Sequence, residues 1–170
     1  MGVILDITAG NRLIWGKNVN PEGVIFIDQE TRLRIPPTLF ADNTNLPIRT
    51  DLKIDSILFD PPWGINLPPW MIDPDRSTNS RASFFGDFKS KRDLVSYLIR
   101  TEKELKKYTR RICFKWGERN VTLWSILGIF TRNGWKEKHR VKLNAPKNRG
   151  GKSTNQTWWV ILKKEKLEDE

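Results

Sequence analysis

The sequence predicts an α/β protein with a mostly parallel sheet and one antiparallel strand near the carboxyl end. Apolar runs in the first half are short and continuous, which is typical of strands buried on both faces. The second half contains two segments with helical periodicity and then two further strand-like segments joined by a loop. A length of 170 residues fits one domain, residues 1–170.

The predicted buried strands mostly end on acidic side chains. The strands are expected at five runs: 3–7, 23–28, 38–42, 56–60 and 110–116. Asp28, Asp42 and Asp60 close three of them, and Asp6 lies near the end of the first. Between the first two strands, only 11–20 has the composition of a helix. The connections of the first half are therefore expected to be short.

Two helices are predicted, over 89–108 and 120–134. Ser90 and Asp93 resemble a capping box at the start of the first helix, and Gly134 suits the position after the last turn of the second. The apolar stripes on which the predictions rest comprise Leu94, Leu98, Thr101, Leu105 and Tyr108, and then Leu123, Ile126, Leu127 and Phe130. Two strands follow at 137–143 and 157–164, with a basic loop over 144–156 between them.

Composition narrows the classes of partner. Lys and Arg number 30 against 20 Asp and Glu, a formal charge of +10, which favours nucleic acid as a polyanionic partner. A basic surface that serves only solubility is the alternative. No apolar run is long enough to cross a membrane, and one Cys (Cys113, expected to be buried) with one His leaves no zinc site. The protein is expected in the cytoplasm, without membrane or metal.

The end of the first strand, "LDITAG", has the character of a ligand-binding turn. Ligands of open α/β sheets bind at the carboxyl ends of strands, and the small Thr8, Ala9 and Gly10 allow close approach there. Asp28, about 20 residues on, is placed to accept both hydroxyls of a ribose. A pyrophosphate would need a glycine-rich loop and would be repelled by Asp6, whereas S-adenosylmethionine carries positive charge. An ordinary tight turn is the alternative.

The fourth strand runs into "FDPPW", the most informative stretch of the sequence. An aromatic amine is a poor nucleophile, and acceptors aimed at its hydrogens stabilise the positive charge that develops on nitrogen. The Asp60 carboxylate and the Pro61 carbonyl fit that role, and Pro61 and Pro62 fix the backbone. Trp63 offers a flat face for a base. A proline-terminated strand with a buried Trp is the alternative.

This block resembles the [D/N/S]-P-P-[Y/F/W] motif of class I S-adenosylmethionine-dependent methyltransferases that methylate exocyclic amines. Further blocks, "LDITAGNRLIW", "FIDQE", "FADNTNLP", "FKWGE" and "KSTNQTWWVILKK", resemble in order those of small phage and mobile-element methyltransferase-like proteins. Trp63 stands where many members of that group carry a histidine, which favours the aromatic version that acts on nucleobases. The resemblance implies a Rossmann-like class I methyltransferase sheet and, for a viral protein, the host cytoplasm.

The same resemblance implies a set of site residues. The methionine part of S-adenosylmethionine would contact Asp6, Thr8, Ala9 and Gly10; the ribose Asp28, with Gln29 beside it; and the adenine Asp42 and Asn43. The target amine would be held by Asp60, Pro61, Pro62 and Trp63. Adenine is the first choice of target base and cytosine the second, in DNA or RNA. The reaction needs no metal.

Three segments are expected to hold the nucleic acid around the target base. They are the long loop 64–88, the end of the fifth strand, where Lys115 and Trp116 stand, and the basic loop 144–156. Ordinary solvated loops are the alternative for each. The predicted contacts mix cations with one ring: Trp70, Arg76, Arg81, Lys115, Lys147, Arg149 and Lys152.

Neither a helix ahead of the first strand nor a separate target-recognition domain is predicted from this sequence. Sequence specificity is then expected to be low or to come from a partner, which a second copy of the chain could be. Two other functions stay open. One is a nucleic-acid-binding module with a degenerate methyltransferase fold. The other is methylation of a protein glutamine amide, against which the +10 charge argues.

Overall fold

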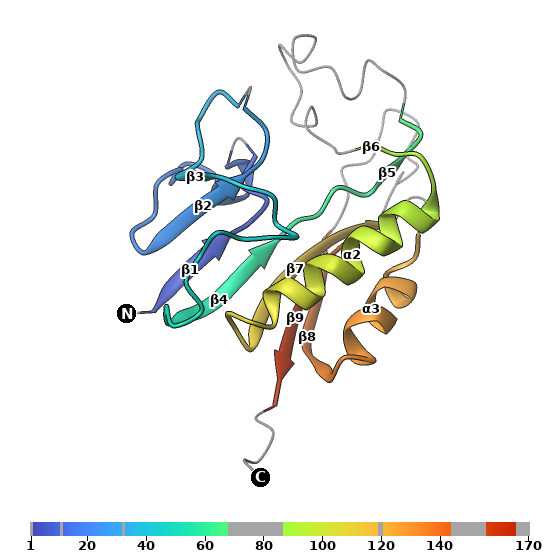
Figure 1. The fold of residues 1–170 in the computed structure, drawn as a ribbon. Helices are drawn as coiled ribbons and strands as arrows, with labels where there is room; N and C mark the ends of the chain where they lie inside the picture. Colours follow the sequence, from blue (N-terminus) through green and yellow to red (C-terminus); the bar gives the residue numbers. More distant parts are fainter. Residues whose placement is uncertain are drawn as a thin grey trace.

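The protein is built around a seven-stranded sheet with the order β3-β2-β1-β4-β7-β9-β8 (Figure 1). The computed structural model describes residues 2–10, 12–31, 33–67, 87–118, 121–143 and 156–165. Neighbouring strands are parallel from β3 to β7, whereas β9 runs antiparallel to both β7 and β8. The predicted α/β class with one antiparallel strand near the carboxyl end is therefore confirmed. The strands are β1 (Val3–Asp6), β2 (Val24–Asp28), β3 (Leu39–Phe40), β4 (Ile54–Phe59), β7 (Arg111–Glu118), β8 (Trp135–Leu143) and β9 (Gln156–Lys164).

The two α-helices of the described residues, α2 (Lys91–Leu105) and α3 (Leu123–Thr131), cover one face of the sheet (Figure 1). The predicted cap is confirmed at Ser90, whose side chain accepts a hydrogen bond from the amide of Asp93. The core between helices and sheet consists of apolar side chains on alternate strand positions. Among them are Ile57, Phe59, Ile112, Phe114, Trp116, Val160 and Leu162, packed with Leu94, Leu98, Leu127 and Phe130.

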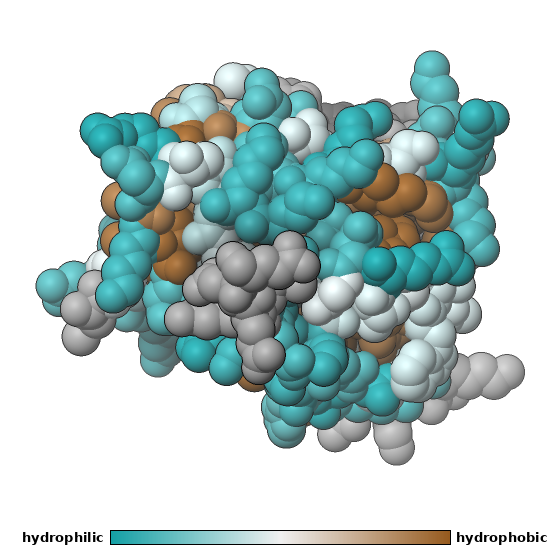
Figure 2. Space-filling view, turned by 60° about the horizontal axis from the view of Figure 1, so that its bottom comes forward, coloured by the Kyte–Doolittle hydropathy of each residue, from teal (hydrophilic) through white to brown (hydrophobic). Residues whose placement is uncertain are grey.

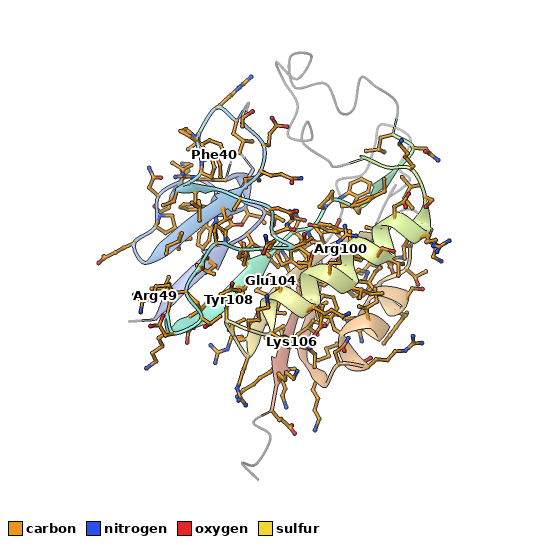
Figure 3. All side chains as sticks on the ribbon, viewed as in Figure 1. Phe40, Arg49, Arg100, Glu104, Lys106 and Tyr108 are labelled. Atoms are coloured by element: carbon orange, nitrogen blue, oxygen red, sulfur yellow. The ribbon has the colours of Figure 1, made fainter. Side chains whose placement is uncertain are left out.

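A buried polar cluster fixes the chain between β3 and β4 against the end of α2. The Glu104 carboxylate accepts from the Leu46 amide at 3.1 Å and from the Tyr108 hydroxyl at 3.0 Å (Figure 3). Burial acts to raise the pKa of Glu104, but hydrogen bonds from Lys107 and Tyr108 outweigh it and lower that pKa. The Tyr108 hydroxyl also lies 3.0 Å from the Leu46 carbonyl. The cluster therefore holds the approach to β4 in place.

The helix expected at 11–20 is not formed. Only a 3-10 turn is present there, η1 (Leu13–Trp15), and Arg12 before it has a positive φ of 58°. The Arg12 guanidinium is buried, lies 3.9 Å from the Phe26 ring centroid and donates to the Val19 and Pro36 carbonyls and to the Asn20 side chain. These long-range contacts hold the segment as a loop folded onto β2.

Three smaller expectations also need correction. Gly134 does not cap α3: the cap is Arg132, and Gly134, with a φ of 84°, makes the turn into β8. Cys113 is half-buried rather than buried. Within 64–88, a short parallel pair forms between β5 (Gly64–Ile65) and β6 (Asp87–Phe88), and 68–86 lie outside the described residues.

The face of the molecule that Figure 2 shows is mainly hydrophilic, and its apolar residues gather in separate patches. None of the described helices has the length and apolarity needed to cross a membrane.

Candidate active site

The candidate site lies where the strand order of the sheet reverses. β1 and β4 are neighbours, with β2 and β3 on one side and β7 on the other. The register pairs Asp6 with Leu58, and the Ile7 amide donates to the Leu58 carbonyl at 3.2 Å. The ends of β1 and β4 therefore open side by side at the switch point, where open α/β sheets bind their ligands.

The turn after β1 is tied to β2 through a carboxylate. Gly10 has a positive φ of 49°, and its amide donates to Asp28 Oδ2 at 2.8 Å. The other oxygen of Asp28 accepts from the Glu30 amide at 2.9 Å. A carboxylate oxygen has more than one lone pair, so both oxygens keep capacity for a ligand hydroxyl. The turn after β1 and the end of β2 therefore meet at Asp28.

Asp6 is a buried carboxylate with few partners. It is 1% exposed, accepts from Trp15 Nε1 at 2.8 Å and from the Thr8 amide at 3.3 Å, and lies near Asp28 and Asp60. Burial raises the pKa of Asp6 to about 6, and the hydrogen bonds from Trp15 and Thr8 oppose that rise. Three carboxylates gathered at one sheet edge favour a ligand that brings positive charge.

Asn43, a predicted site residue after β3, has a partner on α2 that the sequence analysis did not name. Asn43 donates to the Tyr97 hydroxyl at 2.7 Å and to the Ile7 carbonyl at 3.4 Å, which ties it to α2 and β1. Burial raises the pKa of Tyr97. Asp42 is exposed and accepts from the Thr44 amide at 2.8 Å, and Gln29 is exposed. Tyr97 follows Leu94 by three residues, a helical spacing that could have indicated it.

The Asp60-to-Trp63 block continues directly from β4. The Asp60 amide donates to Thr8 Oγ1 at 2.7 Å, so the block is fastened to the turn after β1. Lys115 Nζ lies 2.5 Å from Asp60 Oδ2. Burial raises the pKa of Asp60, and the Lys115 ammonium opposes that rise. Lys115 was predicted to contact nucleic acid, and in the structure its amine is engaged by Asp60.

Trp63 lies against the backbone of β7. A Cβ atom on Gly117 would stand 3.4 Å from two atoms of the Trp63 indole, a van der Waals distance, so the ring lies directly against this residue of β7. Trp63 and Pro62 are half-buried, and Pro61 is buried. The indole is therefore held by packing at the end of β4, beside Asp60.

Most of the other nucleic-acid contacts predicted from the sequence fall on residues that the structure does not describe. Trp116, named with Lys115 at the end of the fifth strand, is fully buried and donates to the Val121 carbonyl at 3.0 Å, so it belongs to the core. No group of side chains within the described part of the chain has the make-up of a metal site. Six predicted contacts lie outside the described residues: Trp70, Arg76, Arg81, Lys147, Arg149 and Lys152.

Comparison with known proteins places the fold. No protein-family model and no curated protein matches the chain. A Listeria monocytogenes protein designated a putative S-adenosylmethionine-dependent methyltransferase superposes with a TM-score of 0.53 at 9% identity, over 97% of this chain and 92% of the other. A Pyrococcus horikoshii protein designated a putative RNA methyltransferase gives 0.52 at 10% identity, over 95% and 74%.

The catalytic domain of hMettl16, solved with the MAT2A 3′UTR hairpin 1, gives a TM-score of 0.53 at 12% identity. That superposition covers 98% of this chain and 65% of the hMettl16 domain. At these identities the likeness concerns the fold. The chain has the fold of S-adenosylmethionine-dependent methyltransferases.

Proposed function

We propose that this protein is an S-adenosylmethionine-dependent methyltransferase that modifies an exocyclic amino group of a nucleobase, adenine before cytosine, in DNA or RNA. One observation carries the proposal: the Asp60-to-Trp63 block ends β4 at the switch point and is fastened by Thr8 to the turn after β1. A ligand at that turn and an amine at Asp60 would meet in one place.

The residues at the ends of β1, β2 and β3 fit the cofactor. S-adenosylmethionine would supply a methyl group bound to a positively charged sulfur, and the cluster of Asp6, Asp28 and Asp60 favours such a charge. Asp28 would hold the ribose while keeping its bond to the Gly10 amide. Asp42 and Asn43 would meet the adenine, and the hydrogen bond that Asn43 donates to Tyr97 would orient its amide for this contact.

The block at the end of β4 would position and polarise the amine. Lys115 occupies Oδ2 of Asp60, which leaves Oδ1 and the Pro61 carbonyl as acceptors for the two amine hydrogens. Preorganised acceptors lower the barrier because they need not reorient as charge develops. Trp63 would stack on the base, which must be unpaired or flipped out of a duplex to reach this edge.

A nucleic-acid substrate is supported by two separate considerations. The chain carries a formal charge of +10, and a polyanion binds such a surface with favourable counterion release. The hMettl16 domain, which shares the fold, was solved with an RNA hairpin. A partner for target recognition, which a second copy of the chain could be, belongs to the same proposal.

The test is methyl transfer from labelled S-adenosylmethionine to single-stranded DNA and RNA, followed by nucleoside analysis. We expect label on an exocyclic nitrogen and a loss of about 10²–10³ in turnover for Asp60→Ala, with cofactor affinity nearly kept. Trp63→Ala should weaken capture of the base by roughly 1–3 kcal/mol, and Trp63→Phe should retain much of the activity. Label on ring carbon or on the protein, or full turnover in Asp60→Ala, would refute the proposal.

One observation favours a second candidate, a nucleic-acid-binding module without turnover. The Lys115 ammonium already occupies part of the carboxylate on which the chemistry would depend. Calorimetry separates the two candidates. Tight binding of an oligonucleotide by a folded protein that takes up no S-adenosylmethionine would favour the module.

A further inference from the structure

Four side chains at the β8 edge of the sheet form an alternating stack, here called the cation–indole ladder: Trp124, Arg140, Trp158 and Lys142. The Arg140 guanidinium lies 4.4 Å from the Trp124 ring centroid and 5.5 Å from that of Trp158. The Lys142 ammonium lies 5.5 Å from the Trp158 ring. Cations and indoles attract in this arrangement. The four residues come from α3, β8 and β9, so the ladder joins three elements.

Two carboxylates hold the ladder in shape. Glu118, the last residue of β7, accepts from Trp158 Nε1 at 3.1 Å and from the amide of Leu123 at 2.7 Å, which fixes the start of α3 relative to Trp158. Glu137 Oε1 lies 3.0 Å from Arg140 Nε. Glu118 and Glu137 therefore hold Trp158 and Arg140, the two inner residues of the cation–indole ladder, in position.

The outer end of the ladder is open to solvent. Trp124 is 66% exposed, more than any other large hydrophobic side chain in the described part of the chain. One side of its indole faces Arg140, and the exposed fraction shows that much of the remainder faces water. If the ladder only packed α3 onto β8, a shorter apolar side chain at 124 would achieve this without exposing an indole.

The ladder lies near the carboxyl ends of β7 and β8. The strand register places Trp116 of β7, Trp158 of β9 and Lys142 of β8 in one row across the sheet and on one face of it. The next residue of β7, Gly117, faces the other side of the sheet, where Trp63 packs against it. Two strand spacings, about 10 Å, separate the row position of Lys142 from β7, the strand against which Trp63 packs.

We propose that the cation–indole ladder is a subsite for single-stranded nucleic acid, in which an unpaired base of the strand that carries the target stacks on the open side of Trp124. Lys142, at the other end of the ladder, pairs with a phosphate further along the same strand. This inference rests on the proposed function, because it concerns the strand whose target base lies at Asp60. Aromatic faces with flanking cations bind single strands with little preference for base, since every base has a π-face. The competing interpretation is a surface that binds another protein and no nucleic acid, and the binding test distinguishes the two.

The test is fluorescence anisotropy of short labelled single-stranded RNA and DNA with the parent protein, Trp124→Ala, Trp124→Phe and Lys142→Ala. Loss of one stacked base weakens binding about 5- to 140-fold, which is 1–3 kcal/mol at about 1.4 kcal/mol per tenfold. Trp124→Phe keeps a ring and should stay close to the parent. Lys142→Ala should lower the slope of log affinity against log salt by about 0.7, whereas Trp124→Ala should leave that slope unchanged.

A matched control removes the same kinds of side chain at the opposite edge of the sheet. Leu52, 39% exposed, and Lys53, also exposed, precede β4, so Leu52→Ala with Lys53→Ala removes one apolar and one basic side chain, as the double variant Trp124→Ala with Lys142→Ala does. Binding by the control pair should equal that of the parent. Equal weakening in both pairs would mean that only overall charge matters and would overturn the subsite.

Two readouts separate the subsite from the proposed function. In the methylation assay, Trp124→Ala should raise the KM for the oligonucleotide and leave kcat at saturation unchanged. Binding within about twofold of the parent by folded Trp124→Ala protein overturns the subsite, even if methylation proceeds. If the parent binds oligonucleotide through Trp124 yet never transfers methyl, the subsite stands and the proposed function fails.

Discussion

Replacing Lys115 by methionine tests whether the ion pair with Asp60 serves the chemistry or obstructs it. The two groups lie 2.5 Å apart, and methionine keeps most of the aliphatic stem while removing the charge. Burial already raises the pKa of Asp60, and the Lys115 ammonium holds it down. Because the ammonium favours the ionised carboxylate, its removal raises the pKa of Asp60 further.

The direction of the resulting change in pH dependence follows from the charges of the pair. An opposite charge in direct contact favours the ionised carboxylate. The two side chains are 28% and 23% exposed, so solvent weakens this interaction without abolishing it. The amine acceptor must be ionised, so the acidic limb of the pH–rate profile should move to higher pH.

The assay is methyl transfer at saturating cofactor over a range of pH, with Lys163→Met as control. Lys163 is an exposed lysine of β9 that lies opposite Arg111, four residues before Lys115 on β7. The control should leave the profile unchanged, and cofactor affinity should be kept in both variants. An unmoved acidic limb in Lys115→Met, or a variant faster than the parent at every pH, would show that Lys115 does not support Asp60.

Three other changes probe the cofactor end of the site and the stability of the fold. Asp28→Ala should abolish S-adenosylmethionine binding in calorimetry, because charge-assisted hydrogen bonds contribute roughly 1.5–3 kcal/mol each. An affinity equal to that of the parent would show that the second strand does not end at the ribose. Since burial raises the pKa of Asp6 to about 6, affinity for the cationic cofactor should grow as pH rises through 6, and Asp6→Asn should lose that dependence. Tyr108→Phe deletes hydroxyl contacts with Glu104 and the Leu46 carbonyl and should lower the free energy of unfolding by about 1–3 kcal/mol; an unchanged urea midpoint contradicts this.

The order of strands and helices could be predicted because it depends on local apolar patterns. Continuous runs such as Ile57 to Phe59 are buried, and the stripe beginning at Leu94 and Leu98 faces the core as its spacing requires. The helix predicted at 11–20 is absent because Arg12 bonds to residues far along the chain, and helix propensity does not include such contacts. Local pattern predicts an element well only where burial of its own stripe dominates.

The candidate site divides in the same way. The acids at the strand ends were predictable, since parallel strands bring their carboxyl ends to one edge. What each acid touches was not, because this depends on register between strands. Lys115 was predicted to contact nucleic acid because it is basic and stands at the end of the fifth strand. Only the pairing of β4 with β7 brings it to Asp60. Likewise, Trp124 and Arg140 lie 16 positions apart in the sequence and meet only because β8, after the turn at Gly134, packs back against α3.

Asp60 is held at two atoms by two different strands, and this decides how the variants should be interpreted. Its amide is bonded to Thr8 Oγ1 on the turn after β1, and its carboxylate to Lys115 on β7. The backbone bond couples the position of the acceptor to the turn that would hold the cofactor, whereas the side-chain bond does not. Removing the carboxylate or its lysine should therefore change turnover and leave cofactor affinity intact. A change at Thr8 would move both quantities together, because it loosens the turn and the acceptor at once.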